Sequence, residues 1–150
     1  GDARVPLAAN AIARHLSPAQ VATLEARLTT RTLAAGATLF AEGETGEELY
    51  IVVRGRVEIL LRTSAHHHKR LAVYGAGSFF GELALLKRGP RAGHAVAASD
   101  TELLALSLAA FERLKQDDPA LAIALLTALC ETLVNIQRWS TRELQRLSEW

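Results

Sequence analysis

The sequence predicts a mainly β domain with flanking α-helices: a small antiparallel jelly roll or barrel, N-terminal helices and a long C-terminal helix. Residues 31–107 carry short β-like runs separated by frequent glycines, a pattern typical of an all-β region. Their spacing, with tight glycine turns, suits antiparallel pairing better than a parallel βαβ sheet, which would need a crossover helix between successive strands. Extended helical periodicity lies in the two flanks. We therefore divide the chain into an N-terminal helical lead-in (1–30), a β core (31–107) and C-terminal helices (108–150).

The residues before the β core predict two helical pieces. Ser17 is a suitable N-cap, Pro18 occupies the first helical position, and Gln20 completes a capping box. A helix is therefore expected to begin at Pro18. The Ala-rich segment 5–15 predicts a further short helix.

Six runs of apolar and β-branched residues are the candidate strands of the core, and turn residues separate them. They are residues 38–41, 49–53, 56–61, 70–74, 94–97 and 102–106. Their short, regular spacing favours antiparallel pairing in a jelly roll or barrel.

Helical periodicity returns after the core. Ser107 is a suitable N-cap for a short helix that extends to Lys115, and Asp118 followed by Pro119 predicts the start of a longer helix that reaches the C-terminus. Four apolar residues of this helix recur at alternating spacings of three and four, which is typical of a face that packs on a partner helix. We call them the C-terminal seam: Leu126, Leu129, Leu133 and Ile136.

Composition limits the classes of function. The formal net charge of +1 gives no general attraction to nucleic acid or to an anionic membrane, so we expect this segment to bind neither. The longest apolar stretch, residues 121–130, is about half of the roughly 20 residues that a membrane-spanning helix needs. The single cysteine, Cys130, rules out a disulfide framework within one chain. Because it lies in an apolar helical run, we expect Cys130 to be buried. A single cysteine is compatible with a cytoplasmic protein, which is the location we expect.

The segment 79–92 has the clearest chemistry of the chain. Gly81 permits a turn that other residues resist, and residues 82–86 are expected to form a short helix whose first N–H groups suit a phosphate. A Gly-Pro pair ends that helix, and Arg91 then begins an extended run in which its guanidinium can meet two phosphate oxygens. Glu82, an acceptor when ionised, suits a ribose hydroxyl. A phosphate and a ribose held together indicate a nucleotide, and the alternative is a structural ion pair at a loop.

Two short stretches give this segment a specific motif: Gly81-Glu82-Leu83-Ala84-Leu85-Leu86 and Pro90-Arg91-Ala92. The motif resembles the phosphate-binding cassette of the cyclic-nucleotide-binding domain family, which includes the catabolite-activator and protein-kinase-A regulatory-subunit types. Upstream segments resemble the first strands and turns of that family in the same order, namely residues 36–40, 42–44, 46, 49–52 and 55–57. The resemblance extends from Leu33 through the C-terminal helix.

The resemblance implies an eight-stranded antiparallel jelly roll, or double-stranded β-helix, flanked by helices. It also implies how a cyclic nucleotide is held. The phosphate falls on Arg91, Ala92, Leu83 and Ala84, and the ribose 2′-hydroxyl falls on Glu82 beside Gly81. A Thr or Ser directly after the arginine often favours guanine in the family, so Ala92 favours cAMP over cGMP.

Base recognition in the family involves the C-terminal helix. The Thr-Ser pair that holds adenine in the catabolite-activator type falls on Ile136 and Gln137, of which only Gln137 can form a hydrogen bond. Trp139 is a candidate lid that stacks on the base, and ordinary helix packing is the alternative role for this aromatic side chain.

Other chemistries have weak support in the sequence. His66, His67 and His68 are consecutive on an expected loop and have no carboxylate or cysteine nearby, so we expect a solvated hairpin and no metal site. No arrangement typical of a nucleophile or of paired catalytic carboxylates is present, so we expect no enzyme activity. The basic pairs Lys69-Arg70 and Lys87-Arg88 lack interleaved aromatics and are interpreted as solvated faces.

The leading hypothesis is a regulatory cAMP-binding module in which the C-terminal helix moves as a lid or as the contact of a homodimer. Three alternatives stay open. A DNA-binding regulator needs a helix-turn-helix after the long helix, and the sequence ends at Trp150 without one. The second alternative is that the domain is a piece of a larger transporter or enzyme, and Gly1 in place of an initiator Met favours it. A degenerate member with an empty pocket would only dimerise.

Overall fold

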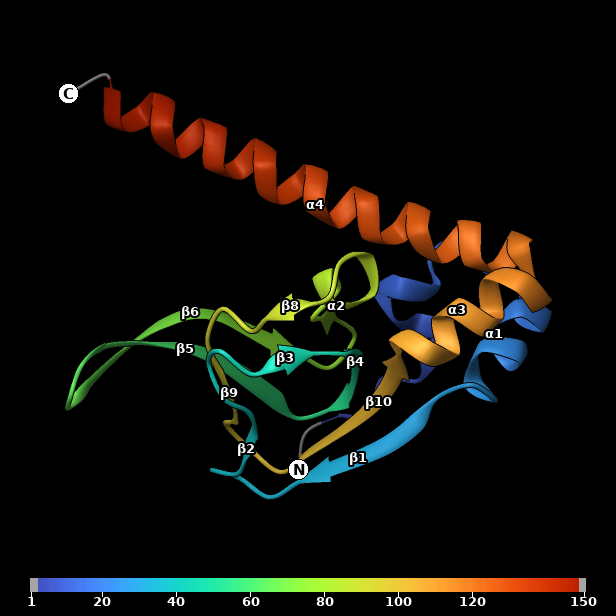
Figure 1. The fold of residues 1–150 in the computed structure, drawn as a ribbon, viewed down its shortest axis with the longest axis horizontal. Coiled ribbons are helices and arrows are strands. Elements are labelled where there is room, and N and C mark those ends of the chain that lie inside the picture. The colour runs from blue at the N-terminus through green and yellow to red at the C-terminus, as the bar shows by residue number, and fades with distance from the viewer. Residues whose placement is uncertain (1–2, 149–150) are drawn as a thin grey trace.

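The computed structural model describes the backbone of residues 3–148, and the side chains of these residues except those at 136, 137, 139, 140, 147 and 148. Two four-stranded sheets form the β core (Figure 1). The first sheet contains, in spatial order, β1 (Thr29–Leu33), β10 (Thr101–Ser107), β4 (Glu48–Arg54) and β7 (Phe79–Phe80). The second contains β2 (Thr38–Phe40), β9 (His94–Ala97), β5 (Arg56–Ser64) and β6 (His67–Gly75).

A two-stranded ladder completes the core. In it, β3 (Thr45–Gly46) pairs with β8 (Gly89–Pro90), with Gly46 opposite Gly89. Every strand pair in the described chain is antiparallel. The predicted fold class, an antiparallel β core with helices at both ends, is confirmed.

All six predicted strands are present, and the structure adds four that the sequence did not reveal. Three of these, β3, β7 and β8, have only two residues each. The fourth, β1, begins two residues before the predicted start of the core, and four of its five residues are exposed. An exposed edge strand such as Thr-Thr-Arg-Thr-Leu shows no alternation of apolar and polar residues, which is why its hydrophobic pattern gave no signal.

The N-terminal segment forms short helices that pack on the first sheet. Two 3-10 turns, η1 (Leu7–Ala9) and η2 (Ala11–Ala13), occupy the segment where a short helix was expected. Helix α1 (Pro18–Glu25) begins as predicted, because Ser17 accepts from the Gln20 N–H and the Gln20 side chain accepts from the Ser17 N–H. These elements contribute Ile12 and Leu24 to the core.

Strand β4 separates two hydrophobic cores. Leu49 and Ile51 face the helices and belong to a core that includes buried residues of every helical layer. Tyr50 and Val52 face the other way, into a smaller core between the two sheets. All four side chains are buried, with at most 6% of their surface exposed. A central strand buried on both faces therefore joins the helical layer to the interior of the β core.

Two helices follow the core, and their caps confirm the predicted starts. Ser107 accepts from the Ala110 N–H at the start of α3 (Leu108–Asp117). Asp118 accepts from the Leu121 N–H at the start of α4 (Pro119–Ser148). Figure 1 shows α4 crossing the helical layer and then extending away from the sheets. Within residues 3–148, no helix combines the length and the apolar content that would be needed to span a bilayer.

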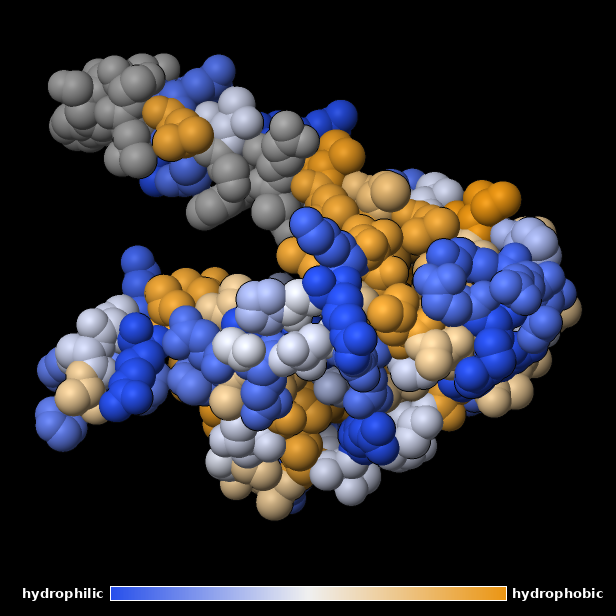
Figure 2. All heavy atoms as spheres, in the orientation of Figure 1, coloured by the Kyte–Doolittle hydropathy of each residue, from blue (hydrophilic) through white to orange (hydrophobic). Residues whose placement is uncertain are grey.

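The packing of α4 corrects two predictions. Leu129 of the C-terminal seam is fully buried against its own domain, together with Leu121 and Leu125, so it does not face a partner helix. Cys130, expected to be buried, is exposed. Both results follow from the position of each residue around the helix. Leu129 faces the core, and the next residue, Cys130, is turned about 100° further around α4 and faces the surface. In Figure 2, apolar side chains gather over the middle of α4, and hydrophilic ones cover the tip of the β5–β6 hairpin.

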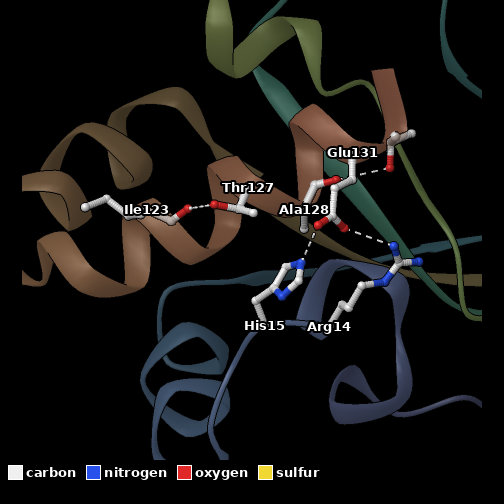
Figure 3. Close-up of polar contacts among 7 residues, drawn as sticks. Arg14, His15, Ile123, Thr127, Ala128 and Glu131 are labelled. Atoms are coloured by element: carbon white, nitrogen blue, oxygen red, sulfur yellow. Dashed lines mark hydrogen bonds and ion pairs between the residues drawn. The ribbon is translucent and has the colours of Figure 1, made fainter. Parts of the chain in front are cut away.

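Polar contacts of Glu131 connect α4 to the N-terminal segment, just after the last fully buried turn of α4 (Figure 3). Glu131 Oε1 lies 2.8 Å from His15 Nε2, and Glu131 Oε2 accepts from Arg14 Nη1 at 3.0 Å. The hydrogen bond with His15, supported by Arg14, holds the pKa of the Glu131 carboxyl below its ordinary value. This cluster is called here the Glu131 clamp.

The lowered pKa predicts how the Glu131 clamp depends on pH. Because the folded protein binds the Glu131 proton more weakly than the unfolded chain, the clamp stabilises the fold at neutral pH, and this contribution is lost as the pH falls through the folded-state pKa. We expect Glu131→Gln to lower the melting temperature at pH 7, and the difference from the wild type to disappear in acid.

The control for this measurement is Glu112→Gln, which removes another exposed ion-paired glutamate, the partner of Lys115. Calorimetry gives the melting temperatures of the wild type, Glu131→Gln and Glu112→Gln between pH 3 and pH 8. A difference between Glu131→Gln and the wild type that stays constant over this range contradicts the assigned role.

Candidate functional site

A cavity of about 490 Å³ lies between the second sheet and the segment that joins β7 to β9. This volume is within the range of small-molecule sites, roughly 300–1,000 Å³. Five of its lining residues come from strands β2, β3, β5, β6 and β7, namely Phe40, Gly46, Ile59, Tyr74 and Phe80. The rest of the lining comes from residues 81–84 and 87–93. The cavity thus brings together the six residues predicted to hold phosphate and ribose.

The predicted turn and short helix form one wall of the cavity. Gly81 has a φ of 81°, in the left-handed region where glycine is favoured. Helix α2 (Leu83–Leu86) follows directly, with Glu82 as its N-cap, and the β3–β8 ladder then carries the chain back to Arg91. The structure therefore has the local geometry that the sequence predicted for this segment.

Arg91 lies in a slot of aromatic and backbone groups. Its Nη2 donates to the carbonyl oxygen of Glu48 at 2.7 Å. The guanidinium carbon is 4.3 Å from the centroid of the Phe40 ring and 5.5 Å from that of Tyr50. Such stacking on ring faces attracts a cation and fixes the plane of the guanidinium.

Two glycines give this slot its width. A Cβ added to Gly46 would lie 2.5 Å from Arg91 Nε, and one added to Gly81 would lie 2.9 Å from Arg91 Nη1. Both distances are far below van der Waals contact, so the arginine side chain occupies space that any other residue at position 46 or 81 would fill. The absence of two side chains therefore determines where the guanidinium lies.

The charge of Arg91 has no counter-ion in the described chain. No carboxylate of residues 3–148 with a described side chain forms an ion pair with it. Its Nε is buried and has no hydrogen-bond acceptor. Burial raises the pKa of the neighbouring Tyr50, as does the charge of Glu48, while Arg91 opposes the shift. A partly buried cation without an acidic partner is the group that an anionic ligand would satisfy.

Glu82 and the backbone of α2 are placed differently from Arg91. Glu82 and Tyr74 both line the cavity, and burial, followed by the negative charge of Glu82, raises the pKa of the Tyr74 hydroxyl. The N–H of Leu83 makes no hydrogen bond within the described residues, whereas the N–H of Ala84 already donates to the Gly81 carbonyl at 3.1 Å. Of the two predicted backbone donors, only that of Leu83 is available without rearrangement.

The remaining predicted residues divide into two groups. Ala92 is exposed and lines the cavity. The side chains of Ile136, Gln137 and Trp139, the predicted base and lid residues, lie outside the described part of the chain, although their backbone belongs to α4.

Sequence reasoning missed several residues of the cavity. The aromatic wall consists of Phe40, Tyr74 and Phe80, which line the cavity, and of Tyr50, which packs against Phe40 and Phe80. The centroids of neighbouring rings are 5.0–6.5 Å apart. These residues come from four different strands, so no local pattern joins them. Lys87 and Arg88 are exposed, as predicted for a solvated face, yet they also line the cavity.

The histidine run forms no cluster suited to a metal ion. His67 and His68 begin β6, and His66 lies in the turn before it. Among the residues that the structure describes, no group of three or more His, Cys, Asp or Glu side chains converges as metal ligands would. The rings of His68 and His94 instead lie in a T-shaped arrangement, with their centroids 6.0 Å apart.

The fold and the cavity define a ligand-binding jelly-roll domain with an arginine at the base of its pocket. The profile of the cyclic nucleotide-binding domain family matches residues 30–118, more than half of the chain. The chain therefore belongs to the cyclic nucleotide-binding domain family, and the resemblance found in the sequence is confirmed.

Relatives and solved structures agree with this assignment. The chain is 31% identical over 127 residues to a CRP-like cAMP-activated global transcriptional regulator of Mycobacterium tuberculosis, covering 85% of the chain and 57% of that protein. It superimposes on the catabolite activator protein of Thermus thermophilus with a TM-score of 0.81 and 31% identity, over 93% of this chain and 63% of that one. It also superimposes on the N-terminal domain of a Streptomyces coelicolor transcriptional regulator with a TM-score of 0.79 and 34% identity, over 89% of this chain and 94% of that one. The chain thus spans little more than half of the full-length M. tuberculosis regulator.

The slot around Arg91 predicts the effect of adding one carbon atom. We expect Gly46→Ala to displace the Arg91 side chain, to destabilise the fold by about 1–3 kcal/mol, as overpacking does, and to weaken cyclic-nucleotide binding. Gly75→Ala is the matched control, because a Cβ at Gly75 meets nothing within 4 Å. Urea unfolding and calorimetric titration of both variants provide the comparison, and equal behaviour of the two would contradict the role of Gly46.

Proposed function

We propose that the chain is a regulatory module that binds cAMP in this cavity and is not itself an enzyme. The observation that carries the proposal is the partly buried guanidinium of Arg91, whose buried Nε has no acceptor and which lines a nucleotide-sized cavity without a carboxylate partner in the described chain. Family membership supports a cyclic nucleotide as the anion that completes this group. The M. tuberculosis relative is itself named as cAMP-activated.

In this proposal each part of the nucleotide has its own contacts. The cyclic phosphate binds Arg91, the backbone at Ala92 and the free N–H of Leu83, and Ala84 contributes once its N–H turns from the Gly81 carbonyl. The ribose 2′-hydroxyl donates to the Glu82 carboxylate. Ala92 has no hydroxyl to offer a guanine base, which favours cAMP over cGMP.

The response to the ligand is assigned to α4. Gln137, Ile136 and Trp139 lie on the part of this helix that extends from the domain, where they are proposed to contact or cover the base. A ligand that prefers one position of the helix shifts its population and so transmits the signal. The three proposed units, residues 1–30, 31–107 and 108–150, correspond to helical lead-in, sensor and output.

A second candidate places the chain in a larger regulator. The match to the N-terminal domain of the S. coelicolor transcriptional regulator covers 94% of that domain, and this favours the sensor half of a transcription factor over a transporter or enzyme fragment. In this case DNA binding belongs to another part of the protein. Within residues 1–150 we expect neither nucleic acid nor membrane as a partner, given the net charge of +1, and a cytoplasmic location.

The proposed site predicts a large effect of Arg91→Ala. Because the charged phosphate loses its partly buried partner, we expect the free energy of cAMP binding to fall by about 2–5 kcal/mol. Isothermal titration of the wild type and the variant with cAMP and cGMP measures this. Unchanged affinity in Arg91→Ala, or no binding of either nucleotide to the wild type, overturns the proposal.

Glu82→Ala serves as the companion variant, because it removes the acceptor of the ribose hydroxyl while the phosphate contact stays intact. It is expected to bind cAMP and 2′-deoxy-cAMP equally, whereas the wild type prefers cAMP. A preference that persists in Glu82→Ala would remove Glu82 from the ribose site.

We further propose that α4 pairs with a second copy of the chain through the outward residues of the C-terminal seam. Leu133 is only partly buried and its neighbour Val134 is 43% exposed, while Leu129 faces the core. We expect the wild type to sediment as a dimer and Leu133→Arg as a monomer. Ile123→Arg changes a side chain of α4 that is 64% exposed and lies before the seam, turned about 80° from Leu133 around the helix, and this variant is expected to remain dimeric. A monomeric wild type at micromolar concentration contradicts this pairing.

A further inference from the structure

Arg88 borders the cavity but is occupied by a neighbour. It lies in the turn between α2 and β8 and lines the cavity together with Lys87. Its Nη2 forms an ion pair with the carboxylate of Glu47. The two side chains are 65% and 49% exposed, so water screens this pair from both sides.

Glu47 stands between two residues that hold Arg91. A Cβ on Gly46, before it, would lie 2.5 Å from Arg91 Nε. The carbonyl of Glu48, after it, accepts from Arg91 Nη2 at 2.7 Å. The Glu47 side chain therefore brings the guanidinium of Arg88 to the same three-residue segment that Arg91 contacts from within the cavity.

The two arginines differ in their freedom to move. Arg91 is confined by aromatic rings and by the two glycines of its slot, whereas Arg88 is held by one exposed ion pair. Exposed pairs of this kind contribute at most about 1 kcal/mol, so exchanging one costs little. A phosphate offers a guanidinium two oxygens in a planar arrangement and is a competing acceptor for Arg88.

We propose that Arg88 is a second phosphate-binding residue, which leaves Glu47 for the ligand when the cavity is filled. This inference rests on the proposed function, since it takes the cyclic phosphate as the ligand. In the empty state Glu47 holds Arg88 by the ion pair, and in the bound state Arg88 adds a second guanidinium to the phosphate that Arg91 binds.

The exchange also reaches the helical layer. The carbonyl of Glu47 accepts from the N–H of Leu108, the first residue of α3, at 2.8 Å. Helix α3 contacts α4. The backbone of Glu47 thus holds the start of α3, while its side chain holds Arg88. Release of that side chain when a ligand binds therefore frees a residue that contacts the helical layer, and this connects the filling of the cavity to the helices.

Lys87 distinguishes a specific exchange, in which Arg88 moves from Glu47 to the phosphate, from general electrostatic attraction of the ligand. It lines the same cavity and forms no ion pair with a described carboxylate. If Arg88 acted only by raising the local positive charge, Lys87 would do the same, and Glu47 would weaken binding whether or not Arg88 was present.

A double-mutant cycle with cAMP tests the exchange by isothermal titration. Arg88→Gln is expected to weaken binding roughly tenfold, as loss of a hydrogen bond to a charged group does. Glu47→Gln is expected to strengthen binding about two- to fivefold, because Arg88 is then free. In the Arg88→Gln background, Glu47→Gln is expected to have no effect.

Matched controls complete the design. Arg4→Gln removes an exposed arginine with a similar ion pair, to Glu102, outside the cavity lining, and it is expected to leave affinity unchanged. Lys87→Gln is expected to change affinity less than Arg88→Gln. Melting temperatures of all variants verify that each is folded.

Three results would overturn the inference: unchanged affinity in Arg88→Gln, an equal gain from Glu47→Gln in both backgrounds, or equal losses in Lys87→Gln and Arg88→Gln. If the wild type binds cAMP and the cycle is additive, only the exchange fails and the proposed function stands. If the wild type binds no cyclic nucleotide, both fail together.

Discussion

The guanidinium of Arg91 is the group on which the organisation of the domain depends. It is surrounded by rings of β2 and β4, by a carbonyl of β4 and by glycines in β3 and after β7, so elements from distant parts of the sequence must meet to hold it. None of them supplies a negative charge within the described side chains. The fold therefore keeps a partly buried cation whose desolvation an anion offsets. An anion that bound this charge would also stabilise the structure around it, and would in this way link binding to folding.

Features set by local chemistry could be predicted from the sequence. Ser17, Ser107 and Asp118 cap helices because a short polar side chain before a helical run accepts from its first N–H groups. Gly81 adopts the turn that its lack of a side chain permits. These signals lie within a few residues of one another, and they were enough to place the cavity segment and most of the strands.

Features set by long-range packing could not be predicted in this way. The aromatic wall assembles side chains from four strands, and Gly46 matters only because Arg91, far along the chain, crosses it. Likewise, periodicity groups Leu129 with Leu133, but the domain buries only the first, because α4 leaves the core between them. Periodicity identifies a face of a helix, while tertiary contacts decide which part of that face is covered.

Strand β4 gives the cavity a mechanical connection to the helices. Tyr50 stacks beside Arg91, whereas Leu49 and Ile51, its neighbours in sequence, pack against helical residues. Because interiors are close-packed, a displacement of one face of this strand is felt on the other. The helical layer in turn holds α4 through buried leucines, and the N-terminal segment holds it two residues after Leu129 through the Glu131 clamp.

The position of Cys130 has a practical consequence. It is the single thiol of the chain, it is exposed, and it lies on α4 beside Glu131, where the helix leaves the domain. A thiol-reactive fluorophore or spin label would attach there alone, without the removal of other cysteines. The native protein thus carries a ready attachment point for spectroscopy, from which the orientation of α4 can be followed in solution.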